Sequence, residues 1–260
     1  MNIIGIIPAR MGSSRFPGKP LAKICGIPMI GHVYLRSRLC NILDNVYVAT
    51  CDKVIAKYIN SIGAEAIMTS KIHKRASDRV AEALLKIERK TKQKADIVVM
   101  IQGDEPMVYP SMIKEAVRTM LKDKSIQAAN LMSPLKSSLE LEDANTIKVV
   151  VDKDNFALYF SREPIPSGKK TSAHPQAYKQ ICVIPFKRDF LLKFKGLYPT
   201  PLEIAESIDM LRIIEHGFKV KMVSTRLETH SVDSLADLRI VEGLMKKDPL
   251  FSRYVLKGKS

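Results

Sequence analysis

Apolar runs of strand length alternate with segments of helical periodicity through the first half of the chain. We expect strands at residues 2–7, 45–49, 65–68 and 97–101. Between them, apolar residues recur every three to four positions, which predicts helices at residues 29–39, 54–62, 80–87 and 113–121. This alternation builds a parallel sheet with helices on both faces, and ligands of such sheets bind beyond the carboxyl ends of the strands. The loops after the strands are therefore where a site is expected.

The second half of the chain has a different pattern. Residues 147–151 and 156–160 read as two strands around a polar turn, which predicts an antiparallel hairpin. Residues 167–176 are polar and predict a loop, and a single helix is expected from about Thr200 to Gly217. Ser234 and Asp237 form a capping-box pattern for the last helix. No domain boundary is evident, so we expect one domain over residues 1–260 with residues 147–200 as an arm.

Composition and charge narrow the classes of protein. The 260 residues contain 46% hydrophobic and 27% charged residues, without a membrane-length apolar run or a secretion signal, so we expect a cytoplasmic protein without a membrane partner. The cysteines are widely spaced, which favours free thiols over a zinc site or disulfides. The net charge of +15 comes from lysines spread along the whole chain, which favours a site for small anions over nucleic-acid binding.

The stretch PARMGSSRFPGKP, from Pro8 to Pro20, directly follows the first predicted strand. Its glycines allow backbone amides to approach an anion closely, and its arginines and lysine supply positive charge. Five residues separate Gly12 from Gly18, and Pro20 follows Lys19, so the stretch is not a Walker P-loop. The alternative is a basic, solvated turn, but the prolines indicate a rigid loop. We therefore interpret the stretch as a cradle for phosphates.

A second polar cluster, IQGDEP, follows the strand at residues 97–101. Asp104 and Glu105 are expected at the same edge of the sheet as the phosphate cradle. Carboxylates beside phosphates repel them unless a divalent cation lies between, and hard oxygen ligands favour Mg²⁺. Asp233 follows the apolar Val232, and its alternative interpretation is a residue that helps to start the last helix.

Several segments resemble the 3-deoxy-manno-octulosonate (Kdo) cytidylyltransferase family, the CMP-Kdo synthetases. They are PARMGSSRFPGKPL, VATCD, HKRASDR, IQGDEP, IKVVVDKDNFALYFSREPIP, the PLE…LR…G helix and SVDSLADL. The resemblance covers nearly the whole chain. It implies a Rossmann-like nucleotidyltransferase fold of the α/β class, with a mostly parallel central sheet and an antiparallel hairpin arm for dimerisation. It also implies a Mg²⁺-dependent homodimer that joins CMP from CTP to a hydroxyl of Kdo and releases pyrophosphate, a step in lipopolysaccharide biosynthesis.

The resemblance also implies roles for individual residues. Lys19, Asp104, Arg10 and Arg15 are expected to be catalytic, and Asp104 and Asp233 are expected to hold the metal. The nucleotide is expected to contact Pro8, Ala9, Arg10, Ser13, Lys19, Arg75, Ser77, Arg79 and Gln102. The anionic acceptor is expected to contact Gln102, Arg162, Gln180, Ile184, Asp209 and Met210.

Departures from the family pattern fall mostly on the expected acceptor residues. The family pattern HxGIYxY is QICVIPF here, so Gln180 stands in place of a histidine and Ile184 in place of a tyrosine. Asp209 and Met210 replace a Glu-Gln pair, and RASDR replaces SGTDR, which adds Arg75 beside the nucleotide. A buried hydrogen bond left unmade costs roughly 1–3 kcal/mol, so these changes should weaken binding of Kdo itself.

The sequence therefore indicates the reaction more clearly than the acceptor. We expect a cytidylyltransferase that acts on Kdo or a related ulosonic acid. The alternatives are a cytidylyltransferase for another acceptor, such as a phosphonate or a spore-coat-type sugar, and a non-catalytic nucleotide-binding homologue. Retention of Arg10, Lys19, Asp104 and Asp233 argues against the non-catalytic alternative.

Overall fold

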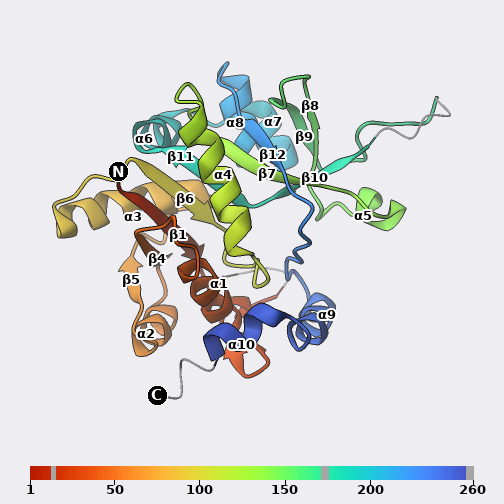
Figure 1. Cartoon of the computed structure of the whole chain (residues 1–260). Coiled ribbons are helices and arrows are strands. Elements are labelled where there is room, and N and C mark those ends of the chain that lie inside the picture. The colour runs from red at the N-terminus through yellow and green to blue at the C-terminus, as the bar shows by residue number, and fades with distance from the viewer. Residues whose placement is uncertain (13–15, 171–175, 256–260) are drawn as a thin grey trace. The chain divides into compact units, whose positions relative to one another are not determined.

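The structure is a computed structural model that describes residues 1–12, 16–170 and 176–255 (Figure 1). The chain forms two compact units. Unit 1 comprises Met1–Lys114 with Thr229–Ser260, and unit 2 comprises Glu115–Glu228. The first division falls inside the helix α4 (Pro110–Lys122) and not in a flexible linker, which explains why no boundary was evident in the sequence. The expected arm, residues 147–200, lies wholly within unit 2.

Unit 1 contains a parallel sheet in the strand order β6, β1, β4, β5, as predicted (Figure 1). These strands are β6 (Ile97–Ile101), β1 (Ile3–Ala9), β4 (Asn45–Thr50) and β5 (Glu65–Met68). The connecting helices are α1 (Met29–Arg38), α2 (Lys53–Ser61) and α3 (Ala76–Thr91). A short helix η1 (Lys19–Leu21) and the small hairpin of β2 (Lys23–Ile24) and β3 (Ile27–Pro28) lie between β1 and α1.

Strand β1 is the centre of this sheet because it pairs with β4 on one side and with β6 on the other. All its residues are buried, as the continuous apolar run requires of a strand that is covered on both faces. Ile6 and Ile7 are completely buried. The end of β1 at Ala9 is therefore held in place by the sheet, and so is the start of the polar stretch that follows it.

Unit 2 contains a mixed sheet in the order β12, β7, β10, β8, β9. The bounds of the strands are β12 (Lys221–Ser224), β7 (Ala129–Pro134), β10 (Tyr178–Ile181), β8 (Lys148–Val151) and β9 (Ala157–Ser161). The predicted hairpin is confirmed, since β8 and β9 pair antiparallel and Asn155 in their turn has a φ of 58°. Unit 2 also contains α5 (Ser138–Glu142), β11 (Val183–Lys187) and α6 (Arg188–Gly196).

The prediction of one helix from Thr200 to Gly217 is wrong. The structure has two helices there, α7 (Pro201–Glu206) and α8 (Asp209–Glu215). Ser207 ends α7 in the left-handed conformation, with a φ of 56°, which a continuous helix cannot contain. Arg212 of α8 forms a buried ion pair with Glu203 of α7, and this pair stabilises the bend.

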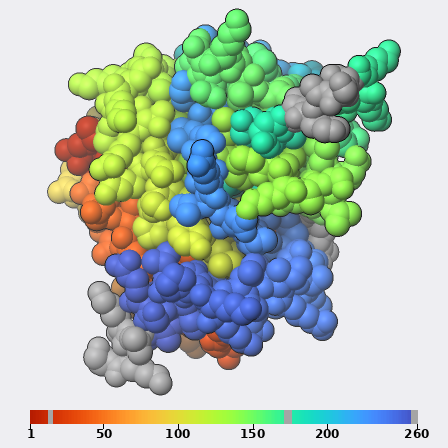
Figure 2. All heavy atoms as spheres, turned by 45° about the vertical axis from the view of Figure 1, so that its right-hand side comes forward, coloured from red at the N-terminus to blue at the C-terminus, as the bar shows by residue number. Residues whose placement is uncertain are grey.

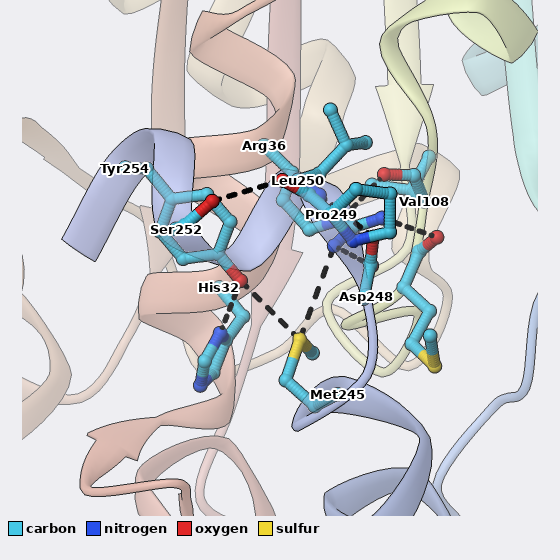
Figure 3. Close-up of polar contacts among 10 residues, drawn as sticks. His32, Arg36, Val108, Met245, Asp248, Pro249, Leu250, Ser252 and Tyr254 are labelled. Carbon is cyan, nitrogen blue, oxygen red and sulfur yellow. Dashed lines mark hydrogen bonds and ion pairs between the residues drawn. The ribbon is translucent and has the colours of Figure 1, made fainter. Parts of the chain in front are cut away.

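The end of the chain returns to unit 1 as α9 (Leu235–Met245) and α10 (Pro249–Val255), shown in dark blue in Figure 2. The predicted capping box at the start of α9 is confirmed: Ser234 and Asp237 exchange hydrogen bonds of 2.8 and 3.2 Å. Figure 3 shows how α10 is anchored. The buried guanidinium of Arg36 pairs with Asp248, and the ring of His32 bonds to Tyr254 (2.8 Å).

Two further features of the described chain bear on its class. None of its helices combines the length and the apolar character that crossing a membrane requires. In the described part of the chain Cys25, Cys40, Cys51 and Cys182 form no disulfide, and Cys40 is buried while the others are partly exposed.

Candidate functional site

A pocket of about 290 Å³ lies in unit 1 at the carboxyl ends of β1 and β6. It is lined by Pro8 and Ala9 at the end of β1, by Arg10 just after it, and by Gln102 and Asp104 just after β6. The remaining described residues that line it are Gly12, Lys19, Pro20, Met29, His73, Lys74, Arg75, Ala76, Arg79 and Gly103. The sheet therefore brings together the loop after β1, the loop after β6 and the start of α3, as predicted.

Close packing of two strand ends makes a glycine necessary in this pocket. A Cβ on Gly103 would lie 2.8 Å from the carbonyl oxygen of Pro8 and 3.2 Å from Ile30. Since the oxygen belongs to the backbone of β1, it cannot move aside. Gly103 therefore allows the loop that carries Asp104 to approach the loop that carries Arg10.

The loop after β1 is held by the neighbouring strand β4. The carboxylate of Asp52, just after β4, accepts a hydrogen bond from the backbone N–H of Met11 (2.8 Å). Gly18 donates to the carbonyl of Met11 (3.2 Å) and has a φ of 79°, so the loop turns sharply into η1. Ser13 and Arg15 lie outside the described residues, and their roles stay predictions. Asp52 was not singled out from the sequence, although it follows a strand end as Asp104 does.

Positive side chains dominate the pocket wall. Arg10, Lys74 and Arg75 line it together with Lys19 and Arg79. Among the described residues of the wall, the acidic side chain is that of Asp104. Lys74 was not predicted, although it lies beside Arg75. A pocket with this balance of charge attracts polyanions such as a triphosphate.

The start of α3 adds further positive potential. Arg75 is the residue before the helix, and Arg79 in the first turns is 3% exposed. The guanidinium of Arg79 donates to the hydroxyl of Thr69 (2.5 Å) and to the carbonyl of Ser70 (3.3 Å), so its position is fixed. Ser77 is buried and does not line the pocket that the described residues form, so its contact with nucleotide stays a prediction. The backbone N–H groups at the start of a helix favour a bound anion.

The segment before α3 is held by Glu82. Its carboxylate accepts hydrogen bonds from Lys86 (2.7 Å), from the backbone of Ser70 (3.0 Å) and from the ring of His73. Burial alone would raise the pKa of Glu82, but these hydrogen bonds and the charge of Lys86 lower it to about 2. The carboxylate therefore stays ionised and keeps His73 at the pocket wall.

Lys19 and two aspartates form the centre of the charged cluster. The ammonium of Lys19 lies 2.9 Å from a carboxylate oxygen of Asp104 and 3.1 Å from one of Asp233. Burial alone would lower the pKa of Lys19, but the charges and hydrogen bonds of both aspartates raise it above its ordinary value. Residues far apart in the sequence therefore meet at one point, as the metal prediction requires.

The backbone around both aspartates is fixed. The carbonyl of Asp104 accepts a hydrogen bond from Val232 (3.0 Å), and the N–H of Asp233 donates to the capping residue Asp237 (3.0 Å). Asp233 thus lies beside the capped start of α9 and also contacts Lys19 in the charged cluster, and its metal role stays a prediction. Glu105 is buried and accepts a hydrogen bond from Thr229 (2.6 Å), and it is absent from the described pocket wall, contrary to expectation.

The two aspartates fit a hard divalent cation that shares its coordination with a ligand. Within the described ranges, no group of three or more His, Cys, Asp or Glu side chains is placed to hold a metal ion. Mg²⁺ is typically bound by one or two carboxylates together with substrate phosphates and water. Asp104 and Asp233 provide such carboxylates around a point that a cation, the Lys19 ammonium, already occupies. The donor set is thus suited to Mg²⁺ with a nucleotide.

The residues expected to contact the acceptor lie in unit 2. Ile184 on β11 is 2% exposed and Met210 in α8 is 1% exposed, while Asp209 is partly exposed at the start of α8. Gln180 on β10 donates to the side-chain oxygen of the buried Asn130. Their contact with an acceptor stays a prediction.

Arg162, the last of these residues, is held by carbonyl groups. Its guanidinium donates to the carbonyls of Glu206 (2.6 Å) and Ala144 (2.8 Å), and its backbone N–H donates to the Glu206 carboxylate (2.8 Å). The side chain therefore connects the end of β9 with the end of α7. Gln102 lines the pocket of unit 1, so the residues expected at the acceptor are divided between the units.

Comparison with known proteins supports the resemblance. Residues 4–229 match the model of a family described as cytidylyltransferase. The chain is 40% identical over 257 residues to the 3-deoxy-manno-octulosonate cytidylyltransferase of Geobacter metallireducens, an alignment that covers 95% of this chain and 99% of the relative. It is 41% identical over 249 residues to the enzyme of the same name from Syntrophobacter fumaroxidans, covering 95% and 98%.

A solved structure extends the likeness to three dimensions. The structure of CMP:2-keto-3-deoxy-manno-octonic acid synthetase complexed with CTP superposes with a TM-score of 0.86 at 35% identity. The superposition covers 95% of this chain and 99% of that one. The predicted nucleotidyltransferase fold of the α/β class is confirmed.

Proposed function

The chain belongs to the cytidylyltransferase family, and from this premise we propose that it transfers CMP from CTP to a hydroxyl of an acidic sugar. The acceptor is Kdo or a related ulosonic acid, and pyrophosphate is released. The observation that carries the proposal is the cationic pocket of unit 1, where Arg10, Lys19, Arg75 and Arg79 surround the ends of β1 and β6. A nucleoside triphosphate has the charge and the size that this wall favours.

The positive side chains hold the triphosphate and stabilise the leaving group. Lys19 and Arg10 bind phosphate oxygens, together with Ser13 and Arg15 of the same loop. Charge builds up on the departing pyrophosphate, and fixed cations that are in place beforehand lower the barrier. Gln102, Pro8 and Ala9 line the same pocket, and we assign Gln102 to the reaction centre and Pro8 and Ala9 to contacts with the nucleotide.

The reaction is an in-line displacement at the α-phosphorus of CTP. The acceptor oxygen forms a bond to the α-phosphorus as the bond from that phosphorus to the β-phosphate oxygen breaks. The hydroxyl loses its proton, which a carboxylate oxygen of Asp104 at the pocket wall can accept. The protein forms no covalent bond in this displacement, so it catalyses the reaction mostly by positioning the reactants and neutralising charge.

Asp104 and Asp233 would hold Mg²⁺ together with the phosphates. The ion would neutralise phosphate charge and lower the pKa of a bound hydroxyl. The support for this proposal is the convergence of both carboxylates on the Lys19 ammonium at 2.9 and 3.1 Å. The capping box of Asp237 keeps Asp233 in place for that role.

The residues of unit 2 that we assign to the acceptor identify it less specifically than the pocket of unit 1 identifies the nucleotide. Gln180 already bonds to Asn130, and Ile184 and Met210 are buried apolar side chains. These residues offer fewer hydrogen bonds than the His and Tyr of the family pattern, which favours a modified ulosonic acid, a phosphonate or a spore-coat-type sugar as an alternative acceptor.

We also propose that the protein is a homodimer, acts in the cytoplasm and serves lipopolysaccharide biosynthesis. Leu158, Tyr198 and Ile204 of unit 2 are 57%, 84% and 64% exposed, and a second copy of the chain would bury apolar side chains of this kind. The reaction takes place in the cytoplasm, where CTP is available. With Kdo as the acceptor, the product serves lipopolysaccharide biosynthesis.

The test is a pyrophosphate-release assay with Mg²⁺ and purified protein. CTP is compared with ATP, GTP and UTP, and each is tested with Kdo, amino-substituted ulosonic acids, sialic-type acids and small phosphonates. The proposal predicts release with CTP and at least one acidic acceptor, and much less release without an acceptor. CTP binding without release across the panel would instead support a non-catalytic nucleotide-binding protein.

A further inference from the structure

The ammonium of Lys19 occupies the point on which the carboxylates of Asp104 and Asp233 converge. We propose that Lys19 is an internal cation that excludes a divalent metal ion until a nucleotide draws its side chain away. The inference rests on the proposed function, because it concerns the nucleotide and the metal named there. It adds an order to their binding: the metal site becomes available when phosphates are present.

The two carboxylates are the fixed part of this arrangement. Asp104 is held through its carbonyl, which accepts from Val232 (3.0 Å), and Asp233 is held through its N–H, which donates to Asp237 (3.0 Å). The backbone of Lys19 is also fixed, since it begins η1 and is followed by Pro20. Its side chain, however, has four rotatable bonds. Lys19 is therefore the group that moves when another cation enters.

A metal ion and the ammonium cannot share this point. Mg²⁺ requires its oxygen ligands at about 2.0–2.1 Å. The ammonium lies 2.9 and 3.1 Å from the carboxylate oxygens that the metal would use, so the two cations would be in direct contact and would repel each other. Metal binding to both carboxylates thus requires that Lys19 leaves them.

Without a nucleotide, the pocket offers the Lys19 ammonium no negatively charged partner to replace the two aspartates. The pocket it would enter is lined by Arg10, Lys74 and Arg75, and among its described residues the acidic one is Asp104 itself. The Lys19 side chain is 12% exposed, so its charge is poorly solvated when it loses both carboxylates. Displacement of Lys19 therefore costs free energy, and this cost weakens metal binding.

Bound phosphates remove this cost because they offer Lys19 a new negative partner in the same pocket. Metal and nucleotide then bind with positive coupling, and thermodynamic linkage requires that each strengthens the other by the same factor. Couplings of this kind are typically about 5- to 150-fold. Lys19 thus has a role besides binding phosphate, and that role is measurable with no reaction taking place.

The experiment titrates Mn²⁺, as a probe for Mg²⁺, into the full chain without nucleotide and follows free Mn²⁺ by electron paramagnetic resonance. Lys19→Met should bind Mn²⁺ about tenfold more tightly than the wild type, because the competing cation is gone. Lys19→Arg should stay as weak as the wild type. Lys57→Met is the control: it removes a lysine charge from the exposed side of α2 in unit 1, outside the described pocket wall, and should leave the affinity near the wild-type value.

The origin of the gain is tested by a second change. Asp104→Asn in the Lys19→Met background should abolish the tighter binding, which assigns it to the converging carboxylates. If Lys19→Met does not fold, as judged by thermal melting, Lys19→Gln replaces it with the same expectation. Mn²⁺ binding by Lys19→Met that is no tighter than that of the wild type and of Lys57→Met would overturn the inference.

A titration with CTP separates this inference from the proposed function. With CTP present, the wild type should bind Mn²⁺ tightly, and the gain from CTP should be smaller in Lys19→Met. If CTP strengthens Mn²⁺ binding in the wild type but Lys19→Met shows no advantage without CTP, the inference alone is wrong. If Mn²⁺ fails to bind with CTP present, the metal assignment in the proposed function is wrong, and the inference is wrong with it.

Discussion

The pocket of unit 1 and the expected acceptor residues of unit 2 differ in how much of their chemistry the residue types reveal. In unit 1, Arg10 and Asp104 are charged groups that closely follow strand ends and Lys19 begins η1, and the structure brings all three to one pocket. In unit 2, Ile184 and Met210 are buried apolar residues whose surroundings resemble any other core. Charged side chains that follow a buried strand indicate a ligand site, whereas buried apolar side chains occur throughout a protein core. The comparison predicts that changes in unit 1 alter the use of CTP and that changes in unit 2 alter the use of the acceptor.

The largest effect is expected for Asp104→Asn. The amide cannot balance the Lys19 ammonium or hold a divalent cation as a carboxylate does. Loss of one such electrostatic contribution should lower kcat by roughly 10²–10³-fold, with the fold retained. Pyrophosphate release measures it, and Asp123→Asn, an exposed carboxylate in unit 2, serves as the control. Near-normal turnover of Asp104→Asn would remove the metal role of this residue.

Acidification should destabilise unit 1 through His32. Burial, with a smaller contribution from the charge of Arg36, lowers the pKa of His32 to about 4, while the unfolded residue has a pKa of 6.5. Below pH 6.5 the unfolded chain binds a proton that the folded chain refuses, so stability falls as the pH decreases from 6.5 towards 4. The expected loss is about 3 kcal/mol in the free energy of unfolding.

Urea denaturation at a series of pH values measures this loss. His32→Phe removes the titrating group and should abolish that part of the pH dependence, although it also loses the bond to Tyr254 shown in Figure 3. An equal slope in the wild type and in His32→Phe between pH 6.5 and 4 would show that His32 is not the group responsible.

Lys19→Ala should impair the use of CTP. A hydrogen bond to a charged group contributes roughly 1.5–3 kcal/mol, so kcat/KM for CTP should fall by about ten- to hundredfold. Lys57→Ala removes an exposed lysine from α2 and is the control. Unchanged kcat and KM in steady-state kinetics would mean that the loop after β1 is only a turn.

Gln180→Ala should affect the other substrate. The change removes the proposed contact of Gln180 with the acceptor, and one hydrogen bond typically contributes about 0.5–1.5 kcal/mol. We expect a rise of a few fold in KM for the acceptor, while KM for CTP stays at the wild-type value. A change confined to KM for CTP would reverse the assignment of the two units.

The smallest effect is expected for Arg75→Ser, which restores the serine of the family pattern. Arg75 lines the pocket and is partly exposed, and such charges typically contribute about 0.2–1 kcal/mol. KM for CTP should rise severalfold at low salt, and the difference should shrink as added salt screens the charge. A difference that does not depend on salt would indicate a packing role for Arg75.

The sequence predicted the sheet of unit 1 because β1, β4 and β6 are buried along nearly their whole length and therefore have apolar runs. It did not predict the break between α7 and α8, because the left-handed conformation of Ser207 has no signal in a residue type that is common in helices and turns. The pairing of Lys19 with both aspartates was also not predicted. Lys19 was assigned to the phosphates and the two aspartates to a metal ion. Their contact with each other depends on side-chain positions that the spacing in the sequence does not reveal.

The most direct test of the central claim follows the phosphorus atoms of CTP by ³¹P nuclear magnetic resonance with protein, Mg²⁺ and Kdo or the best acceptor of the panel. If the protein transfers CMP, the three CTP signals are replaced by equal amounts of pyrophosphate and a phosphodiester, and Asp104→Asn prevents this change. Conversion of CTP to CDP and phosphate, or an unchanged spectrum with every acceptor, would contradict it.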